Sequence, residues 1–233
     1  MSTLLLRLAA PLQSWGTDSK FDKRRETKRE PTKSGVIGLL AAVLGRRRDE
    51  PVDDLAALKF GVRIEQPGQL VCDFQTARKK DSKNPFVTKR EYLADAVFLV
   101  GLEGDRLLLN TLETAVREPV FPLYLGRRSC PPAGKISLGV NDKSLEESLY
   151  EAPWLAGRYY HKKSFIPSSS VRLTLAIDDE TAGYYRRRDY PISFNQKHRK
   201  YIYRYIVDTP NAVPVKAVNQ TEHDVFSAVG EVT

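Results

Sequence analysis

The sequence predicts an α+β protein whose first 140 residues form a ferredoxin-like, or RRM-like, domain followed by a β-rich C-terminal extension. Two observations lead to this prediction. Residues 1–140 show strand-like and helix-like apolar patterns in the order strand, helix, strand, strand, helix, strand, which is the order of the split β-α-β unit. Residues 141–233 contain alternating runs such as SSSVRLTLAID, as half-buried strands do. We expect this second region to pack on the first or to form a small sheet of its own.

The first strand and the first helix come early in the chain. The run TLLLRLAAPL, residues 3–12, is typical of a largely buried strand, which we expect Pro11 to end. The apolar residues that follow at helical spacing are Val36, Leu40, Val43 and Leu44. Thr32 or Ser34 is placed to cap the start of this helix, and Gly45 is placed to end it.

A long hairpin follows the first helix. The strand-like runs LKFGVRIEQ and QLVCDFQTA are joined by the Pro-Gly pair at 67–68, which suits the centre of a type II turn. The second run leads into a basic tip at 78–90, and the chain returns in EYLADAVFLVGLEG as another strand. Asp105 is placed to cap a second amphipathic helix that ends before Pro119, and a final strand is expected within 120–140.

The composition favours a cytoplasmic protein with an anionic partner. No apolar run approaches the length of a membrane span, and the N-terminus lacks the features of a signal peptide. Two cysteines do not make a disulfide framework. The formal net charge is +8, and positive charge is concentrated in residues 20–48, 78–90 and 184–205, whose local net charges are +7, +5 and +6. Such concentration in a few segments favours a nucleic-acid partner.

The stretch YLGRRSCPP, residues 124–132, admits four interpretations. Arg127 and Arg128 would favour a reactive thiolate at Cys130, but no histidine lies near in sequence to act as its base. Zinc needs about four ligands at tight spacing, whereas Cys72 lies 58 positions before Cys130. A glycine-containing loop with paired arginines brings backbone amides and guanidinium groups against phosphate oxygens. A turn with solvated arginines is the fourth possibility.

Three further basic segments each admit a binding and a purely solvated interpretation. Residues 22–35 end at a helix start, where free amides attract anions, although the spacing of a nucleotide-binding Walker loop is absent. The hairpin tip, with Phe86 among its basic residues, suits a grip on a nucleic-acid strand. In residues 184–205 we interpret the alternating tyrosines as lining a sheet face, and the role of the three arginines at 186–188 stays open. Those tyrosines are Tyr201, Tyr203 and Tyr205.

The stretch RYYHKKS supports an alternative, catalytic hypothesis. A metal-free ribonuclease needs a general base near a 2′-hydroxyl group and cations on the scissile phosphate. His161, with Tyr160 and Lys162 beside it, supplies groups of these kinds. Such neighbours are common in basic proteins, so binding without catalysis is the leading hypothesis.

Four segments together resemble one protein family. LLLRLAAPLQSWG, KREPTKSGVIGLLAAVLG, KREYLADAVF and YLGRRSCPP occur in this order over roughly residues 3–140. They resemble the CasD family, which is Cas family five of the subtype I-E CRISPR effector complex, Cascade. The resemblance implies a RAMP-type ferredoxin-like domain with an inserted β-hairpin thumb at about 69–96 and a glycine-rich loop at 124–130. After residue 140 the resemblance extends only to length and general character.

The resemblance also implies a ribonucleoprotein subunit of antiviral defence that binds RNA without cleaving it. Such a subunit caps the 5′ repeat-derived handle of the crRNA beside the backbone subunit CasC and the large subunit CasA, with target DNA nearby and with no cofactor or metal. In the type I-C sister lineage the equivalent subunit instead cleaves precursor crRNA, which is the alternative here. The RNA-binding residues predicted from the resemblance and the charge pattern are Gln13, Trp15, Lys28, Arg29, Thr32, Lys33, Ser34, Arg78, Lys79, Lys80, Lys89, Arg90, Tyr92, Tyr124, Gly126, Arg127, Arg128, Ser129 and Cys130.

Overall fold

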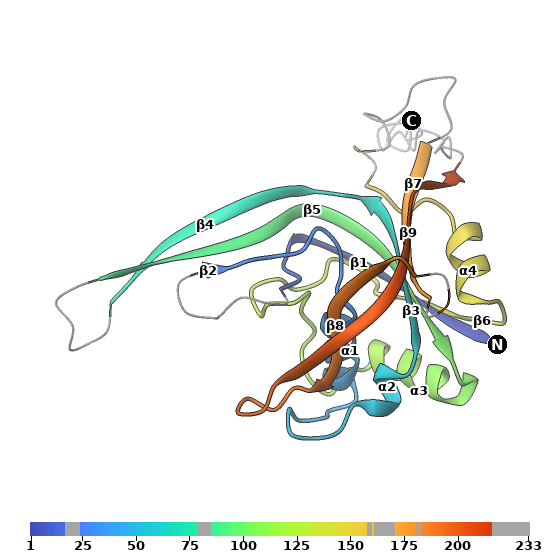
Figure 1. The fold of residues 1–233 in the computed structure, drawn as a ribbon, viewed down its shortest axis with the longest axis horizontal. Helices are drawn as coiled ribbons and strands as arrows, with labels where there is room; N and C mark the ends of the chain where they lie inside the picture. Colours follow the sequence, from blue (N-terminus) through green and yellow to red (C-terminus); the bar gives the residue numbers. More distant parts are fainter. Residues whose placement is uncertain are drawn as a thin grey trace, which may run out of the picture.

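The protein has the predicted α+β class, with one large and mostly antiparallel sheet and few helices (Figure 1). The computed structural model describes residues 1–16, 24–78, 85–157, 160, 171–179, 181 and 183–215. Its strands are β1 (Ser2–Gln13), β2 (Arg24–Arg25), β3 (Lys59–Gln66), β4 (Gln69–Ala77), β5 (Phe86–Gly104), β6 (Ser137–Asn141), β7 (Val171–Asp178), β8 (Tyr185–Ser193) and β9 (Lys200–Val215). Its helices are α1 (Lys33–Val43), α2 (Asp53–Ala56), α3 (Arg106–Arg117) and α4 (Leu145–Glu151).

The strands of the sheet follow the order β6-β1-β5-β3-β7-β9-β8. Each neighbouring pair on this path is antiparallel. β2 and β4 pair with the part of β5 that extends beyond the body of the protein (Figure 1). Because β7 pairs with β3, the strands of the C-terminal region continue the sheet that the first region begins.

The ends of the two long helices agree with the predicted caps. The Thr32 side chain accepts a hydrogen bond from the backbone N–H three residues later, and Asp105 does the same at the start of α3. Gly45 follows α1 with a φ of +77°, a conformation that favours glycine. The short helices α2 and α4 were not predicted, although Ser144 and Glu147 form a capping box at the start of α4.

The first strand is longer than predicted and continues through Pro11 to Gln13. β6 flanks only the first residues of β1, and Pro11 has no partner in the register with β5. The N–H group that proline lacks is therefore not needed by a neighbouring strand at this position. The prediction that Pro11 ends the strand is wrong for this reason.

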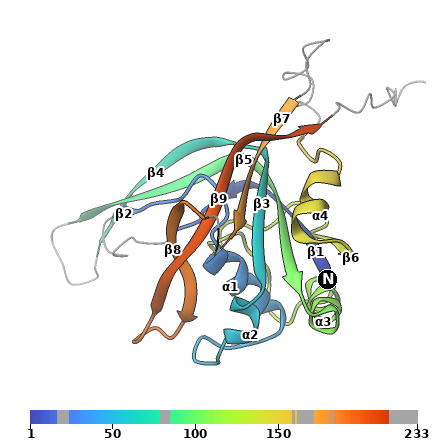
Figure 2. The same cartoon turned by 45° about the vertical axis from the view of Figure 1, so that its right-hand side comes forward.

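The helices cover the two faces of the sheet unequally. α1, α2 and α3 lie on one face, where they enclose the larger apolar core with side chains such as Leu4 and Phe98. α4 lies on the opposite face with a smaller cluster that includes Leu5 and Leu99, the sequence neighbours that point the other way. Figure 2 shows α4 beside β7 and apart from the other three helices. No helix among the described residues is long and apolar enough to cross a membrane.

A buried ion pair lies under the end of α4. The side chains of Arg63 and Glu65 on β3 are both fully buried, and Arg63 Nε donates to Glu65 Oε1 over 2.5 Å. Arg63 also donates to three backbone carbonyls, one in the last turn of α4 at Leu149 and two just after the helix, at Ala152 over 2.8 Å and at Pro153 over 2.8 Å. This one guanidinium group therefore anchors the end of α4 and the chain beyond it to the sheet.

The β4–β5 hairpin projects from the body of the protein (Figure 1). The turn at its base contains Gly68, with a φ of +68°, and a Cβ atom there would lie 2.6 Å from the carbonyl oxygen of Ala94. Only glycine fits this turn, as the Pro-Gly pair in the sequence predicts. Most side chains of β4 are exposed along the projecting part.

Candidate nucleic-acid interface

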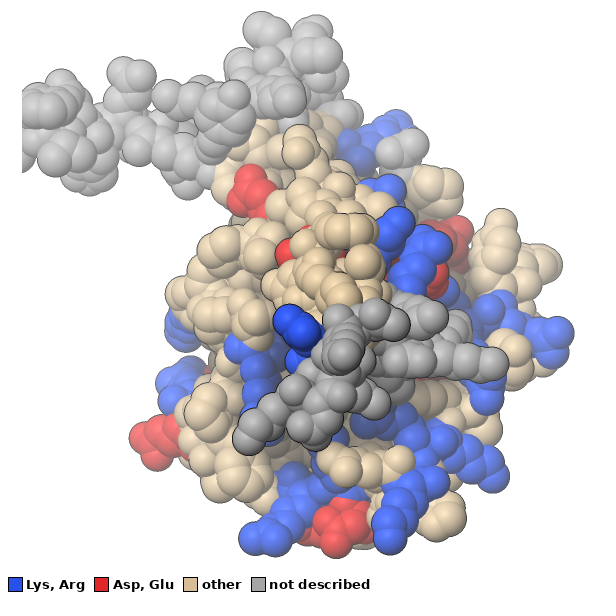
Figure 3. Space-filling model, turned by 90° about the vertical axis from the view of Figure 1, so that its left-hand side faces the viewer, with Lys and Arg blue, Asp and Glu red and all other residues tan. Residues whose placement is uncertain are grey.

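Three basic segments that are far apart in the sequence meet at the base of the β4–β5 hairpin. They are residues 24–28, 89–92 and 124–130, and we call their meeting point the basic junction. β2 pairs in parallel with β5, which places the backbone of the first segment along that of the second. Arg127 Nη2 of the third segment donates a hydrogen bond to the Arg25 carbonyl over 2.9 Å. Figure 3 views the molecule from the hairpin side and shows many lysine and arginine side chains with few acidic ones.

The loop 124–130 is held tightly against the chain that leaves β1. Ser14 N donates to the Leu125 carbonyl over 3.1 Å. Gly126 follows with a φ of +85°, and a Cβ atom at this position would lie 1.6 Å from the Ser14 carbonyl oxygen. Glycine is therefore required here both by the backbone conformation and by the close approach of a second chain segment.

Arg127 lies at the centre of the basic junction. Its guanidinium group sits over the ring of Tyr92, with the carbon atom 4.5 Å from the ring centroid. Its Nη1 atom is buried and has no hydrogen-bond partner, which is true of no other buried side-chain nitrogen or oxygen in the described residues. A buried donor left without an acceptor costs about 1–3 kcal/mol, which the contact with the Tyr92 ring and the hydrogen bond to the Arg25 carbonyl offset in part.

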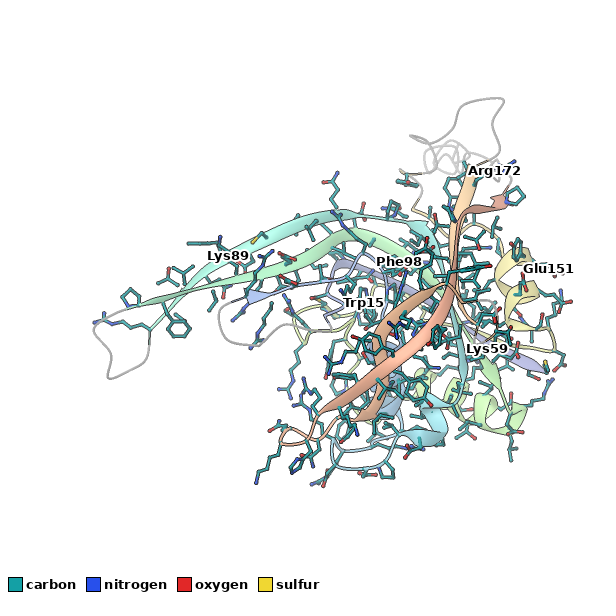
Figure 4. The ribbon with its side chains drawn as sticks, viewed as in Figure 1. Trp15, Lys59, Lys89, Phe98, Glu151 and Arg172 are labelled. Carbon is teal, nitrogen blue, oxygen red and sulfur yellow. The ribbon has the colours of Figure 1, made fainter. Side chains whose placement is uncertain are left out.

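The remaining predicted residues of the hairpin and the loop differ in exposure. The exposed residues are Arg78, Lys89, Arg128 and Ser129. Arg90 and Tyr124 are half-buried, and Tyr92 and Cys130 are buried. Lys79 and Lys80 lie outside the described residues. Lys89, at the outer end of the basic junction, lies partway along the hairpin (Figure 4), and its Nζ is 5.9 Å from the Phe74 ring centroid. The exposed cations therefore extend from the loop along the projecting hairpin.

Gln13 and Trp15 are both buried, so the predicted direct contacts with RNA do not fit their position. Gln13 Nε2 donates to the Ala96 carbonyl over 2.7 Å, and Trp15 Nε1 donates to Gln13 Oε1 over 3.1 Å. Figure 4 shows Trp15 within the body of the protein. These two side chains fix the chain that leads to the basic junction.

The predicted residues at the start of α1 are also buried, namely Thr32, Lys33 and Ser34. The backbone N–H of Lys33 donates to Asp189 Oδ2 of β8 over 2.9 Å, and its ammonium group pairs with Asp178 of β7 over 2.9 Å. Burial lowers the pKa of Lys33, and Asp178 opposes this shift only in part. A carboxylate of the protein itself thus occupies the helix N-terminus that we predicted to attract phosphate.

Two predicted residues, Lys28 and Arg29, are exposed and line a cleft of about 640 Å³ next to the basic junction. The opposite wall of the cleft comes from β8 and β9. The lining residues are Lys28, Arg29, Glu30, Thr32, Arg186, Arg187, Arg188, Asp189 and Tyr203. The basic run at 184–205 pointed to this wall, but the sequence did not show that it faces residues 28–32.

The alternating tyrosines of β9 lie on a sheet face, as predicted, but two of them remain exposed to solvent. The side chain of Tyr203 is 57% exposed and that of Tyr205 is 44% exposed. Arg204, between them, is buried and pairs with Asp189 over 2.6 Å. The strand therefore turns Arg204 inward and Tyr203 and Tyr205 outward.

The thiol interpretation of Cys130 is not supported by its surroundings. The residue is 1% exposed, and burial raises the pKa of its thiol despite the nearby Arg127. Among the described residues no cluster of three or more His, Cys, Asp or Glu side chains is placed to hold a metal ion. Cys72, in contrast, is exposed on β4.

Thiol labelling is expected to distinguish the two cysteines. A maleimide reagent added to the folded protein should modify Cys72 rapidly and Cys130 only after denaturation, because reagent access follows exposure. Mass spectrometry of the intact protein over time measures this directly. Equal labelling rates at both positions would contradict the described packing of the 124–130 loop.

The alternative catalytic residues are only partly described. Tyr160 packs edge to face against Trp154, with ring centroids 6.2 Å apart. His161 and Lys162 lie outside the described residues.

Comparison with known proteins identifies the family. Residues 3–207 match the family model described as CRISPR-associated protein (Cas_Cas5). The chain is 35% identical over 189 residues to the CRISPR system Cascade subunit CasD of Escherichia coli (strain K12), covering 70% of this chain and 82% of that protein.

Two solved structures extend this similarity to the fold. One, described as a CRISPR RNA-guided surveillance complex, has a chain with a TM-score of 0.77 and 35% identity over 91% of each chain. Another, described as the crystal structure of a Cas protein, gives a TM-score of 0.70 and 42% identity over 92% of this chain and 99% of that one. The chain therefore belongs to Cas family five, the CRISPR-associated proteins described as Cas_Cas5.

Proposed function

We propose that this protein is a non-catalytic, RNA-binding subunit of a type I-E Cascade complex in the cytoplasm. It holds the 5′ repeat-derived handle of the crRNA, contacts the backbone subunit CasC and the large subunit CasA, and lies near target DNA during interference. The similarity to an E. coli protein named as a Cascade subunit supports this assignment, as does the similarity to a chain of an RNA-guided surveillance complex.

The finer description of the fold is part of the proposal. The order β6-β1-β5-β3, with α1 and α3 on the same face, supports a ferredoxin-like RAMP domain over residues 1–140. The projecting β4–β5 hairpin is the candidate thumb at about 69–96. Residues 141–233 would then form a β-rich extension of the same sheet.

The basic junction is the observation that carries the RNA-binding proposal. Phosphate binding requires several donors at one place, and here three segments converge through the pairing of β2 with β5 and the bond from Arg127 to Arg25. Arg128 is exposed beside them, so its guanidinium group is accessible to a phosphate. A single-stranded RNA backbone supplies acceptors at the spacing of successive phosphates.

Charge reversal at Arg128 tests the proposed function. We expect Arg128→Glu to weaken binding of single-stranded RNA with the repeat-derived handle sequence by about ten-fold or more, since one phosphate contact is replaced by repulsion. The slope of log affinity against log salt should fall by about 0.7 for the lost contact. Fluorescence anisotropy over a salt series gives both quantities, and a denaturing gel run after incubation in chelator should show intact RNA.

Arg172 provides the matched control. It is an exposed arginine on β7, far from the hairpin and its base (Figure 4), so Arg172→Glu makes the same charge change at another site. Equal losses of RNA affinity for the two variants would mean that the net charge of the protein, and not the position of Arg128, determines binding. Handle-specific cleavage that is abolished by His161→Ala would instead favour the precursor-processing endoribonuclease of the alternative hypothesis.

A further inference from the structure

The cleft between residues 28–32 and the strands β8 and β9 is formed by segments more than 150 positions apart in the sequence. Its volume of about 640 Å³ falls within the range of sites that hold a small ligand or one nucleotide. One wall carries Lys28 and Arg29, and the other carries Arg186, Arg188 and the ring of Tyr203. The cleft lies beside the basic junction but is lined mostly by other residues.

The charge inside the cleft is strongly positive once internal pairs are taken into account. Its two acidic residues already have partners: Glu30 pairs with Arg187, and Asp189 pairs with the buried Arg204. No carboxylate of the described chain forms an ion pair with Arg29 or Arg188, both of which are exposed. The surplus guanidinium groups therefore suit an anionic ligand, and phosphate accepts their hydrogen bonds well.

Tyr203 adds a feature that an inorganic anion would not use. Its side chain is 57% exposed at the cleft wall, and the guanidinium carbon of Arg186 lies 5.5 Å from its ring centroid. A large exposed aromatic ring among arginines is the arrangement on which nucleic-acid bases stack, with the adjoining phosphates held by the cations. An acidic peptide would use the arginines but would not need the ring.

We propose that this cleft binds one unstacked nucleotide of a single-stranded RNA, with its base on Tyr203 and its phosphates against Arg186, Arg188 and Arg29. This inference rests on the proposed function, because the RNA is the strand that the basic junction holds. Lys28 connects the two sites, because it belongs to the basic junction, where its backbone N–H donates to the Trp15 carbonyl over 2.9 Å, and it also lines the cleft. The RNA strand therefore passes from the base of the hairpin across Lys28 to β8 and β9.

Replacement of single bases tests the cleft without disturbing the phosphates. The full chain is titrated with the handle RNA and with versions in which one nucleotide at a time is abasic. We expect Tyr203→Ala to bind the intact RNA about ten-fold more weakly and Tyr203→Phe to bind it almost normally, because stacking needs the ring and not the hydroxyl group. At one RNA position, loss of the base should weaken the unaltered protein by a similar factor and leave Tyr203→Ala unchanged.

Tyr184→Ala is the matched control, since Tyr184 is 89% exposed close by in the sequence but does not line the cleft. If Arg128→Glu weakens binding but Tyr203→Ala does not, the cleft proposal is overturned and the proposed function stands. If the unaltered protein binds no RNA at low salt, both are overturned. A third outcome combines two results: polyglutamate displaces the RNA equally well from the unaltered protein and from Tyr203→Ala, and no abasic substitution weakens RNA binding. The cleft is then a site for acidic polymers, and the proposal fails.

Discussion

Replacement of Arg63 by methionine is expected to lower the free energy of unfolding by about 3–5 kcal/mol, because it leaves the buried carboxylate of Glu65 without its partner. Methionine keeps most of the side-chain volume, so the loss reports charge and hydrogen bonding more than packing. The same change frees three backbone carbonyls at the end of α4 from their donor. Urea unfolding followed by circular dichroism measures the difference.

Arg117→Met is the matched control for this variant. Arg117 pairs with Glu113 on the surface of α3, where its side chain is 56% exposed, so its removal should cost less than about 1 kcal/mol. Changing both buried partners, as Arg63→Met with Glu65→Gln, should recover part of the loss because no unpaired charge is then buried. A loss below about 1 kcal/mol for Arg63→Met alone would show that water reaches Glu65 in solution.

Replacement of Gly126 by alanine is expected to have the largest effect on RNA affinity of any neutral substitution in the basic junction. The added Cβ atom would lie 1.6 Å from the Ser14 carbonyl oxygen, so the loop 124–130 must move away from the chain that follows β1. Arg127 and Arg128 would move with it, and losing their charge-assisted bonds should weaken handle binding by about ten-fold or more. Anisotropy measurements at one salt concentration are sufficient to detect such a change.

Gly134→Ala separates this close approach from backbone strain. Gly134 also has a positive φ, at +77°, but the nearest atom to a Cβ there is Arg7 Nη1 at 3.9 Å. Its substitution should cost about 1 kcal/mol in stability and leave RNA affinity unchanged. If the two alanine variants bind RNA equally well, the position of the 124–130 loop does not determine affinity.

Features with a local cause could be predicted from the sequence. The caps at Thr32 and Asp105, the turn at Gly68 and the strand at 171–178 each depend on a few adjacent residues, and the structure contains all of them. The fold class followed from their order along the chain. The caps of α4 were equally local, but a helix of seven residues gives too short an apolar pattern to stand out.

Features that depend on distant partners could not be predicted in this way. Lys33 looked like a surface cation in a basic loop, yet its partner Asp178 lies 145 positions later in the sequence. Gln13 was predicted to contact RNA because it is polar and lies in a segment that resembles the family, although its amide bonds to Ala96, 83 positions away. Charge patterns identified two segments of the basic junction, and the motif YLGRRSCPP identified the third. Burial decides which of their side chains reach the surface, and burial depends on the whole sheet.

β5 borders four other strands, and it is completed only at Gly104. During synthesis from the N-terminus, β1 and β3 both leave the ribosome before the strand that must lie between them. Pairings between distant residues form slowly, and unpaired apolar strands are prone to aggregate meanwhile. A nascent chain that stalls before Gly104 therefore exposes the apolar residues of β1 and β3, and emergence of β5 is the step at which these two strands can join one sheet.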